Sequence, residues 1–122
     1  MVYVESDFFL ALLKESDWLK PNAEQLYDRY KGDLQTSLVT FIELMLVAKK
    51  FQLSPIKITA AVMKIADYTD IVPLKAAKYI EDGLGVFDAF HAASCNGVIL
   101  SSDHIYDGVN IQRIKLEEFP DD

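Results

Sequence analysis

Residues 86–100 read VFDAFHAASCNGVIL, a helical pattern followed by a glycine and a short apolar run. The spacing predicts a helix over residues 87–96, which Gly97 ends, and Val98 to Leu100 has the composition of a buried strand. A helix that leads directly into a buried strand is the repeating unit of α/β proteins. This stretch therefore indicates an α/β fold with a mostly parallel sheet.

The rest of the chain continues the same alternation. Ser54-Pro55 predicts a helix start, because Ser is a favoured N-cap and Pro is tolerated in the first turn. Pro73 makes its segment an edge strand or a strand end. Residues 117–122 have the composition of a frayed tail. We expect strands at 2–4, 34–37, 70–74, 98–100 and 110–116, and helices at 8–14, 21–30, 40–51, 55–65, 75–81 and 87–96.

Length, composition and charge limit the class of protein. The 122 residues, 51% apolar and 25% charged, predict one ordered domain over residues 1–122. No apolar run approaches the roughly 18–20 residues that cross a bilayer, no secretory signal is visible, and the single Cys95 suits a reducing compartment. We therefore expect a cytoplasmic protein without a membrane partner. A formal charge of −7 argues against a generic nucleic-acid coat, but it allows an enzyme that acts on nucleic acid.

Five carboxylates lie beside apolar segments, where acidic residues are uncommon unless they are paired or bind a metal. In α/β sheets, sites form outside the carboxyl ends of the strands. Two of the five follow the first predicted strand, and another follows the predicted strand at 98–100. The remaining two lie early in predicted helices. We expect all five to gather at one rim, where mutual repulsion favours a divalent metal: Glu5, Asp7, Glu43, Asp88 and Asp103.

Each of these acids also has an ordinary structural explanation. Thr40 and Glu43 match a capping box, in which the glutamate reaches back to the helix start. Asp7 and Asp88 each lie near the start of a predicted helix, where a negative charge interacts favourably with the helix dipole. Asp103 has the sequence context of a turn. Only their joint occurrence at one predicted rim favours a site.

Other catalytic patterns have weaker support. His91 and Cys95 have a spacing that can bind zinc, but two residues do not complete a zinc site. No serine has the context of a nucleophile elbow, and Gly83 and Gly85 lack a phosphate-loop context. The acids therefore remain the principal candidates.

Four segments, which lie in order along nearly the whole chain, resemble the PIN-domain family, particularly VapC-type toxins. They are Val2–Leu10, Thr40–Leu44, Phe87–Ala93 and Ile99–Asp103. The resemblance implies a doubly wound α/β domain with a mostly parallel sheet flanked by helices. It also implies a Mg²⁺- or Mn²⁺-dependent ribonuclease, which often forms homodimers and often has a small antitoxin as partner.

The resemblance also implies roles for particular residues. Glu5, Asp7, Glu43, Asp88 and Asp103 would be catalytic, and all of them except Glu43 would bind metal. Hydroxyls that would support them belong to Ser6, Thr40 and Ser102. The family usually has Asp directly after the first strand and a small polar residue two positions later. Here Glu5 and Asp7 occupy those positions, so either one could be the ligand.

Two other classes of protein are compatible with parts of this pattern. A phosphoacceptor receiver domain has a similar length, but residues 50–60 contain no Asp to end a central strand. A non-catalytic PIN-like interaction module would explain the change at Glu5, and metal binding would distinguish it from an active nuclease.

Overall fold

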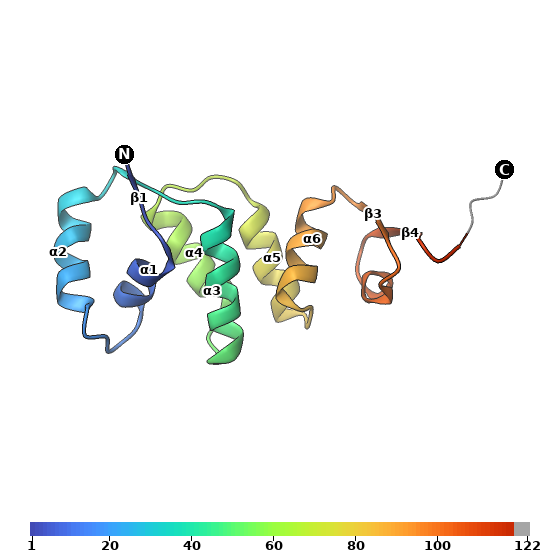
Figure 1. Ribbon diagram of the computed structural model, residues 1–122, viewed down its shortest axis with the longest axis horizontal. Coiled ribbons are helices and arrows are strands. Elements are labelled where there is room, and N and C mark those ends of the chain that lie inside the picture. The colour runs from blue at the N-terminus through green and yellow to red at the C-terminus, as the bar shows by residue number, and fades with distance from the viewer. Residues whose placement is uncertain (119–122) are drawn as a thin grey trace.

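The computed structural model describes residues 1–118, in which six α-helices, one 3-10 helix and four short strands are arranged along an elongated molecule (Figure 1). The strands are β1 (Val2–Tyr3), β2 (Leu34–Gln35), β3 (Val98–Ser101) and β4 (Gln112–Lys115). The helices are α1 (Ser6–Leu13), α2 (Lys20–Tyr30), α3 (Leu38–Lys50), α4 (Pro55–Ile65), α5 (Val72–Glu81) and α6 (Val86–Ser94), with the 3-10 helix η1 (His104–Gly108) between β3 and β4.

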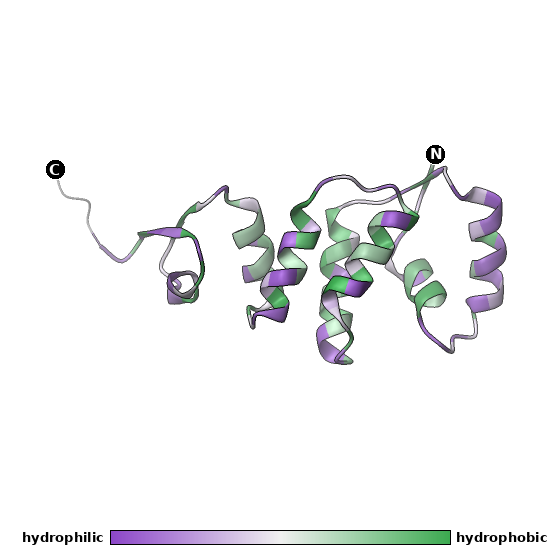
Figure 2. Ribbon diagram, turned by 180° about the vertical axis from the view of Figure 1, so that it is seen from behind, coloured by the Kyte–Doolittle hydropathy of each residue, from purple (hydrophilic) through white to green (hydrophobic). Residues whose placement is uncertain are grey.

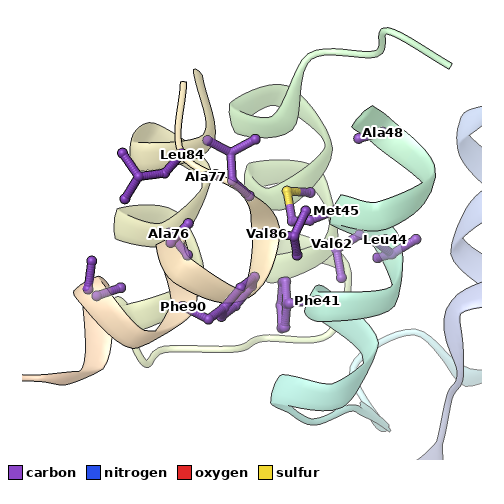
Figure 3. Packing of buried hydrophobic residues seen from close by; sticks show 14 of the residues in the cluster. Phe41, Leu44, Met45, Ala48, Val62, Ala76, Ala77, Leu84, Val86 and Phe90 are labelled. Carbon is purple, nitrogen blue, oxygen red and sulfur yellow. The ribbon is translucent and has the colours of Figure 1, made fainter. Parts of the chain in front are cut away.

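The hydrophobic core lies between the central helices. Figure 3 shows Phe41, Leu44 and Met45 of α3 facing Val62 of α4 and Phe90 of α6. The first four of these side chains are completely buried. Figure 2 shows hydrophobic residues along these helices, whereas α2 is mostly hydrophilic. The core therefore rests on packing between helices.

All strand pairing is parallel, as the sequence predicts. β1 pairs with β2, with Val2 beside Leu34, and β3 pairs with β4, with Val98 beside Gln112. Within the described residues these are two separate two-stranded sheets, not one continuous sheet. The α/β architecture is confirmed, but the helices α3 to α6 lie between its two strand pairs (Figure 1).

Local sequence signals explain where α4 and α5 begin. α4 begins at Pro55, and the hydroxyl oxygen of Ser54 accepts a hydrogen bond from the Lys57 amide at 3.3 Å. The predicted strand at 70–74 is wrong. Asp70 accepts a hydrogen bond from the Val72 amide at 2.9 Å, and Pro73 lies in the first turn of α5. Since proline lacks an amide that the first turn of a helix would leave unpaired, it starts this helix.

The chain turns sharply between α6 and β3. Asn96 and Gly97 both have left-handed backbone, with φ of 53° and 90°. Glycine and asparagine adopt this conformation most readily, so the pair ends the helix and redirects the chain. β3, η1 and β4, residues 98–115, form what we call the C-terminal unit, which lies on the far side of α6 from β1 (Figure 1).

Arg113 links the parts of the C-terminal unit. Its side chain is only 1% exposed, and it donates hydrogen bonds to Asp107 on η1, to the Ser101 carbonyl on β3 and to Glu117, each at 2.8 Å. Glu117 is therefore held in place, although we expected the frayed tail to begin there. Residues 119–122 of that expected tail lie outside the described residues. Among residues 1–118, every helix is too short or too polar to span a bilayer.

Candidate active site

The end of β1 presents two carboxylates. Val4 is buried, and the chain then enters α1 with Glu5 as its N-cap residue and Asp7 in its first turn. The Glu5 backbone is extended, and its side chain makes no capping hydrogen bond. Both carboxylates are exposed to solvent. The first turn of α1 therefore leaves both groups available for a ligand.

A group of hydroxyls lies where β1 pairs with β2 and where α3 begins. The hydroxyls of Tyr3 and Ser37 are 2.6 Å apart. Ser37, Thr40 and Glu43 are each three residues apart, so they follow one face of the start of α3. Hydrogen bonds with Ser37 and then with Thr40 lower the pKa of Tyr3, while burial and the negative charge of Glu43 oppose that shift. We call Tyr3, Glu5, Asp7, Ser37, Thr40 and Glu43 the N-terminal half-site.

The capping-box explanation of Glu43 is wrong. α3 begins at Leu38 with Ser37 as its N-cap, so Thr40 lies inside the helix. Thr40 is 1% exposed, whereas Glu43 is exposed to solvent. Glu43 therefore has no capping role at this helix start.

A second pair of carboxylates lies on the other side of the helical core. Asp88 is half-buried in the first turn of α6, and its Oδ1 accepts a hydrogen bond from the Tyr106 hydroxyl at 3.4 Å. Asp103 follows β3, and its carboxylate accepts a hydrogen bond from the Ile105 amide at 3.0 Å, which caps η1. The turn role expected for Asp103 is thus confirmed. We call Asp88, Asp103 and Tyr106 the C-terminal half-site.

Tyr106 interacts electrostatically with both carboxylates of its half-site. Burial first, and then the charge of Asp88, its hydrogen bond and the charge of Asp103, raise the pKa of Tyr106 to about 12. The neutral phenol is therefore favoured in the folded protein. A phenolate at this position would meet two negative charges.

A pH titration of stability tests this arrangement. Because the pKa of Tyr106 is raised from 10.0 to about 12, its contribution is fully present below pH 10 and is lost as the pH rises through 12. We expect the free energy of unfolding, measured by urea denaturation, to fall more steeply above pH 10 in the wild type than in Tyr106→Phe. Parallel curves for the two proteins would contradict the assignment.

Within residues 1–118, no group of three or more acidic, histidine or cysteine side chains is close enough to hold a metal ion. The five predicted carboxylates are instead divided between the two half-sites. The predicted supports Ser6 and Ser102 lie beside them in sequence, at the start of α1 and after β3. In the described part of the chain, none of the five carboxylates forms an ion pair with a Lys, Arg or His side chain. The ion pairs that do form involve other acidic residues.

These side chains are donors that suit a hard cation. All five are carboxylates, and the Tyr3 hydroxyl that contacts Ser37 also interacts with the negative charge of Glu43. Oxygen ligands of this kind favour Mg²⁺ or Mn²⁺ over zinc. The His91 and Cys95 pair does not offer an alternative, since Cys95 lies just past the end of α6 and its thiol donates to the Ala92 carbonyl at 3.3 Å.

A family model named PIN domain matches residues 2–105. The chain belongs to the PIN-domain family. Comparisons with curated proteins and with solved structures gave no match. The PIN-domain family is one of nucleases, so membership indicates a nuclease-type function and agrees with the resemblance found in the sequence.

The two tyrosines of the half-sites are not among the site residues expected from the sequence. Tyr3 lies in Val2-Tyr3-Val4, which has the pattern of a buried strand, yet its side chain is 54% exposed. Tyr106 lies three residues after Asp103 in what we expected to be an ordinary turn, and it is 3% exposed. Its only sequence signal is an aromatic residue within a polar loop, Asp103-His104-Ile105-Tyr106.

Proposed function

We propose that this protein is a metal-dependent ribonuclease of the VapC toxin type. The observation that supports this most directly is the set of five carboxylates, without cationic partners in residues 1–118, on a chain of the PIN-domain family. Unneutralised acids at strand ends and helix starts repel one another when they meet, and a divalent cation relieves that repulsion. A small antitoxin, homodimer formation and a cytoplasmic location belong to the same proposal.

The proposed roles follow the resemblance to the PIN-domain family. Glu5 or Asp7, together with Asp88 and Asp103, would hold Mg²⁺ or Mn²⁺. A bound cation supplies Lewis-acid polarisation of a phosphodiester and a more acidic water. Glu43, which is exposed beside Ser37 and Thr40, would orient the attacking water through its carboxylate. Tyr106 would keep Asp88 in position through its hydroxyl.

Metal removal is the direct test of this function. Purified protein and structured RNAs are incubated with Mn²⁺, with Mg²⁺ and with a chelator. We expect cleavage only with metal, and a loss of about 100-fold or more with chelator, since a catalytic metal commonly supplies several kcal/mol. Calorimetric titration with Mn²⁺ gives an independent measurement. Absence of both cleavage and binding would instead indicate a non-catalytic PIN-like module, which the change at Glu5 would explain.

A further inference from the structure

Asp103 lies in a short connection between β3 and η1, where its position depends on the backbone around it. β3 ends at Ser101, and η1 begins at His104. The hydroxyl oxygen of Ser101 accepts a hydrogen bond from the Asp103 amide at 3.0 Å, and the Asp103 carboxylate accepts one from the Ile105 amide at 3.0 Å. Whatever fixes the two ends of this connection therefore also fixes the direction of the Asp103 carboxylate.

The guanidinium of Arg113 contacts the chain on both sides of Asp103. Its Nη1 donates to the carbonyl of Ser101, two residues before Asp103, at 2.8 Å. Its Nε and Nη2 donate to the carboxylate of Asp107, four residues after Asp103, at 2.8 and 3.2 Å. Because β4, which carries Arg113, is itself paired with β3, the guanidinium is anchored by its own backbone. Residues 101–107 are thus held at both ends by one side chain.

The geometry of these contacts suits arginine in particular. A guanidinium is planar and carries its donors on three nitrogen atoms, and Arg113 uses all three. A lysine ammonium has its donors on a single atom, so it cannot take the positions of all three nitrogens at once. Hydrogen bonds from Arg113 lower the pKa of Asp107 and of Glu117, which keeps both partners charged. Charge-assisted hydrogen bonds of this kind fix geometry more firmly than neutral ones.

The same contacts extend toward Asp88. Tyr106 lies within residues 101–107, is almost fully buried and donates its hydroxyl to Asp88 at 3.4 Å. Asp107 is the next residue along η1, so its bonds to Arg113 also restrict the backbone of Tyr106. The guanidinium is therefore connected through short chains of contacts to both carboxylates of the C-terminal half-site, although it touches neither of them.

We propose that Arg113 is a positioning residue for Asp103 and, through Tyr106, for Asp88. It holds residues 101–107 in one arrangement before a metal ion binds. A side chain that is already in place loses less conformational freedom on binding, so the affinity for the ion is higher with the guanidinium present. The effect on metal affinity rests on the proposed ribonuclease function, whereas the effect on residues 101–107 does not.

The two carboxylate partners of Arg113 provide a matched pair of variants. Asp107 lies within residues 101–107, whereas Glu117 follows β4 and lies outside them. Both accept from the same guanidinium at 2.8 Å, and their side chains are 48% and 36% exposed. Asp107→Asn and Glu117→Gln each remove one negative charge and one ion pair with Arg113. Only Asp107→Asn loosens the connection that carries Asp103, so the comparison separates positioning from general charge and stability.

Titration with Mn²⁺ tests the effect on metal affinity. Calorimetry and RNA cleavage give the Mn²⁺ concentration for half-saturation of the wild type, Arg113→Lys, Asp107→Asn and Glu117→Gln, and thermal melts show that each is folded. Residues that orient metal ligands commonly contribute about 10–100-fold in metal affinity. We expect half-saturation to need about tenfold more Mn²⁺ in Arg113→Lys and Asp107→Asn, with cleavage largely restored at saturation. Glu117→Gln should stay within about twofold of the wild type.

Amide hydrogen exchange, followed by NMR without metal or RNA, separates this inference from the proposed function. We expect the Ile105 amide, which Asp103 accepts, to exchange faster in Arg113→Lys and Asp107→Asn, while the amide of Leu44 in α3 is unchanged. Unchanged Ile105 exchange, or an equal loss of Mn²⁺ affinity in all three variants, would overturn the inference. Faster exchange in a protein that neither binds Mn²⁺ nor cleaves RNA would support the hold on residues 101–107 and reject the function.

Discussion

Asp88→Asn is expected to lower metal-dependent RNA cleavage by about 100-fold or more while the protein stays folded. Loss of a metal ligand removes several kcal/mol of transition-state stabilisation, and each 1.4 kcal/mol corresponds to about tenfold in rate. Asparagine keeps the shape of the side chain and an acceptor oxygen for the Tyr106 hydroxyl, which is 3.4 Å away. The change therefore removes a charge and little packing.

The measurement is the initial rate of cleavage of a labelled RNA with saturating Mn²⁺, together with a thermal melt of each variant. Asp28→Asn is a matched control, because Asp28 is exposed on α2 and belongs to neither half-site. We expect the control to retain full activity. Undiminished cleavage by Asp88→Asn would reject the assignment of this carboxylate, and an equal loss in both variants would show that the loss is not specific to a metal ligand.

Signals contained in a few neighbouring residues predicted the elements well. Ser54-Pro55 placed the start of α4, and the Gly97 turn with the apolar run after it placed β3. Two predictions were wrong because such a signal was assigned to the wrong element or to the wrong position in a helix. Pro73 suggested a strand end, but it lies in the first turn of α5, and Thr40 resembled an N-cap, although α3 begins at Leu38.

The arrangement of the strands was beyond the reach of such signals. The sequence predicts parallel strands and carboxylates at their ends, and both are present. Whether β3 lies beside β1 depends on long-range packing. Tyr106 attaches the C-terminal unit to α6, and this contact joins residues 18 positions apart in the chain. No period or motif in the sequence encodes it.

The sequence can indicate only some of the residues that make up each half-site. Ser37, Thr40 and Glu43 are close because one helix repeats every few residues, which a sequence can indicate. Tyr3 joins them only because β1 and β2 pair in one particular register, with Tyr3 beside Gln35. The hydroxyl contact between Tyr3 and Ser37 spans 34 positions, so it follows from the pairing of strands.

Phe41→Ala is expected to cause the largest loss of stability of any single change considered. The Phe41 side chain is completely buried, and its ring centroid is 4.7 Å from that of Tyr68. Figure 3 shows it between Phe90 and Val62, where α3 meets α6 and α4. Truncation of a buried phenylalanine costs about 3–5 kcal/mol. Since small domains are stable by about 5–15 kcal/mol, this loss would remove a large part of the total.

Urea denaturation followed by circular dichroism measures this loss, and Phe51→Ala is the matched control. Phe51 is the C-cap residue of the same helix and is 59% exposed, and the Lys50 ammonium lies 5.5 Å from its ring centroid. An exposed cation–π contact contributes about 0.5–1 kcal/mol, so the control should lose no more than about 1 kcal/mol. The difference between the two variants isolates burial, because the residue type and the helix are the same. Equal losses would show that the core does not depend on the contact of α3 with α4 and α6.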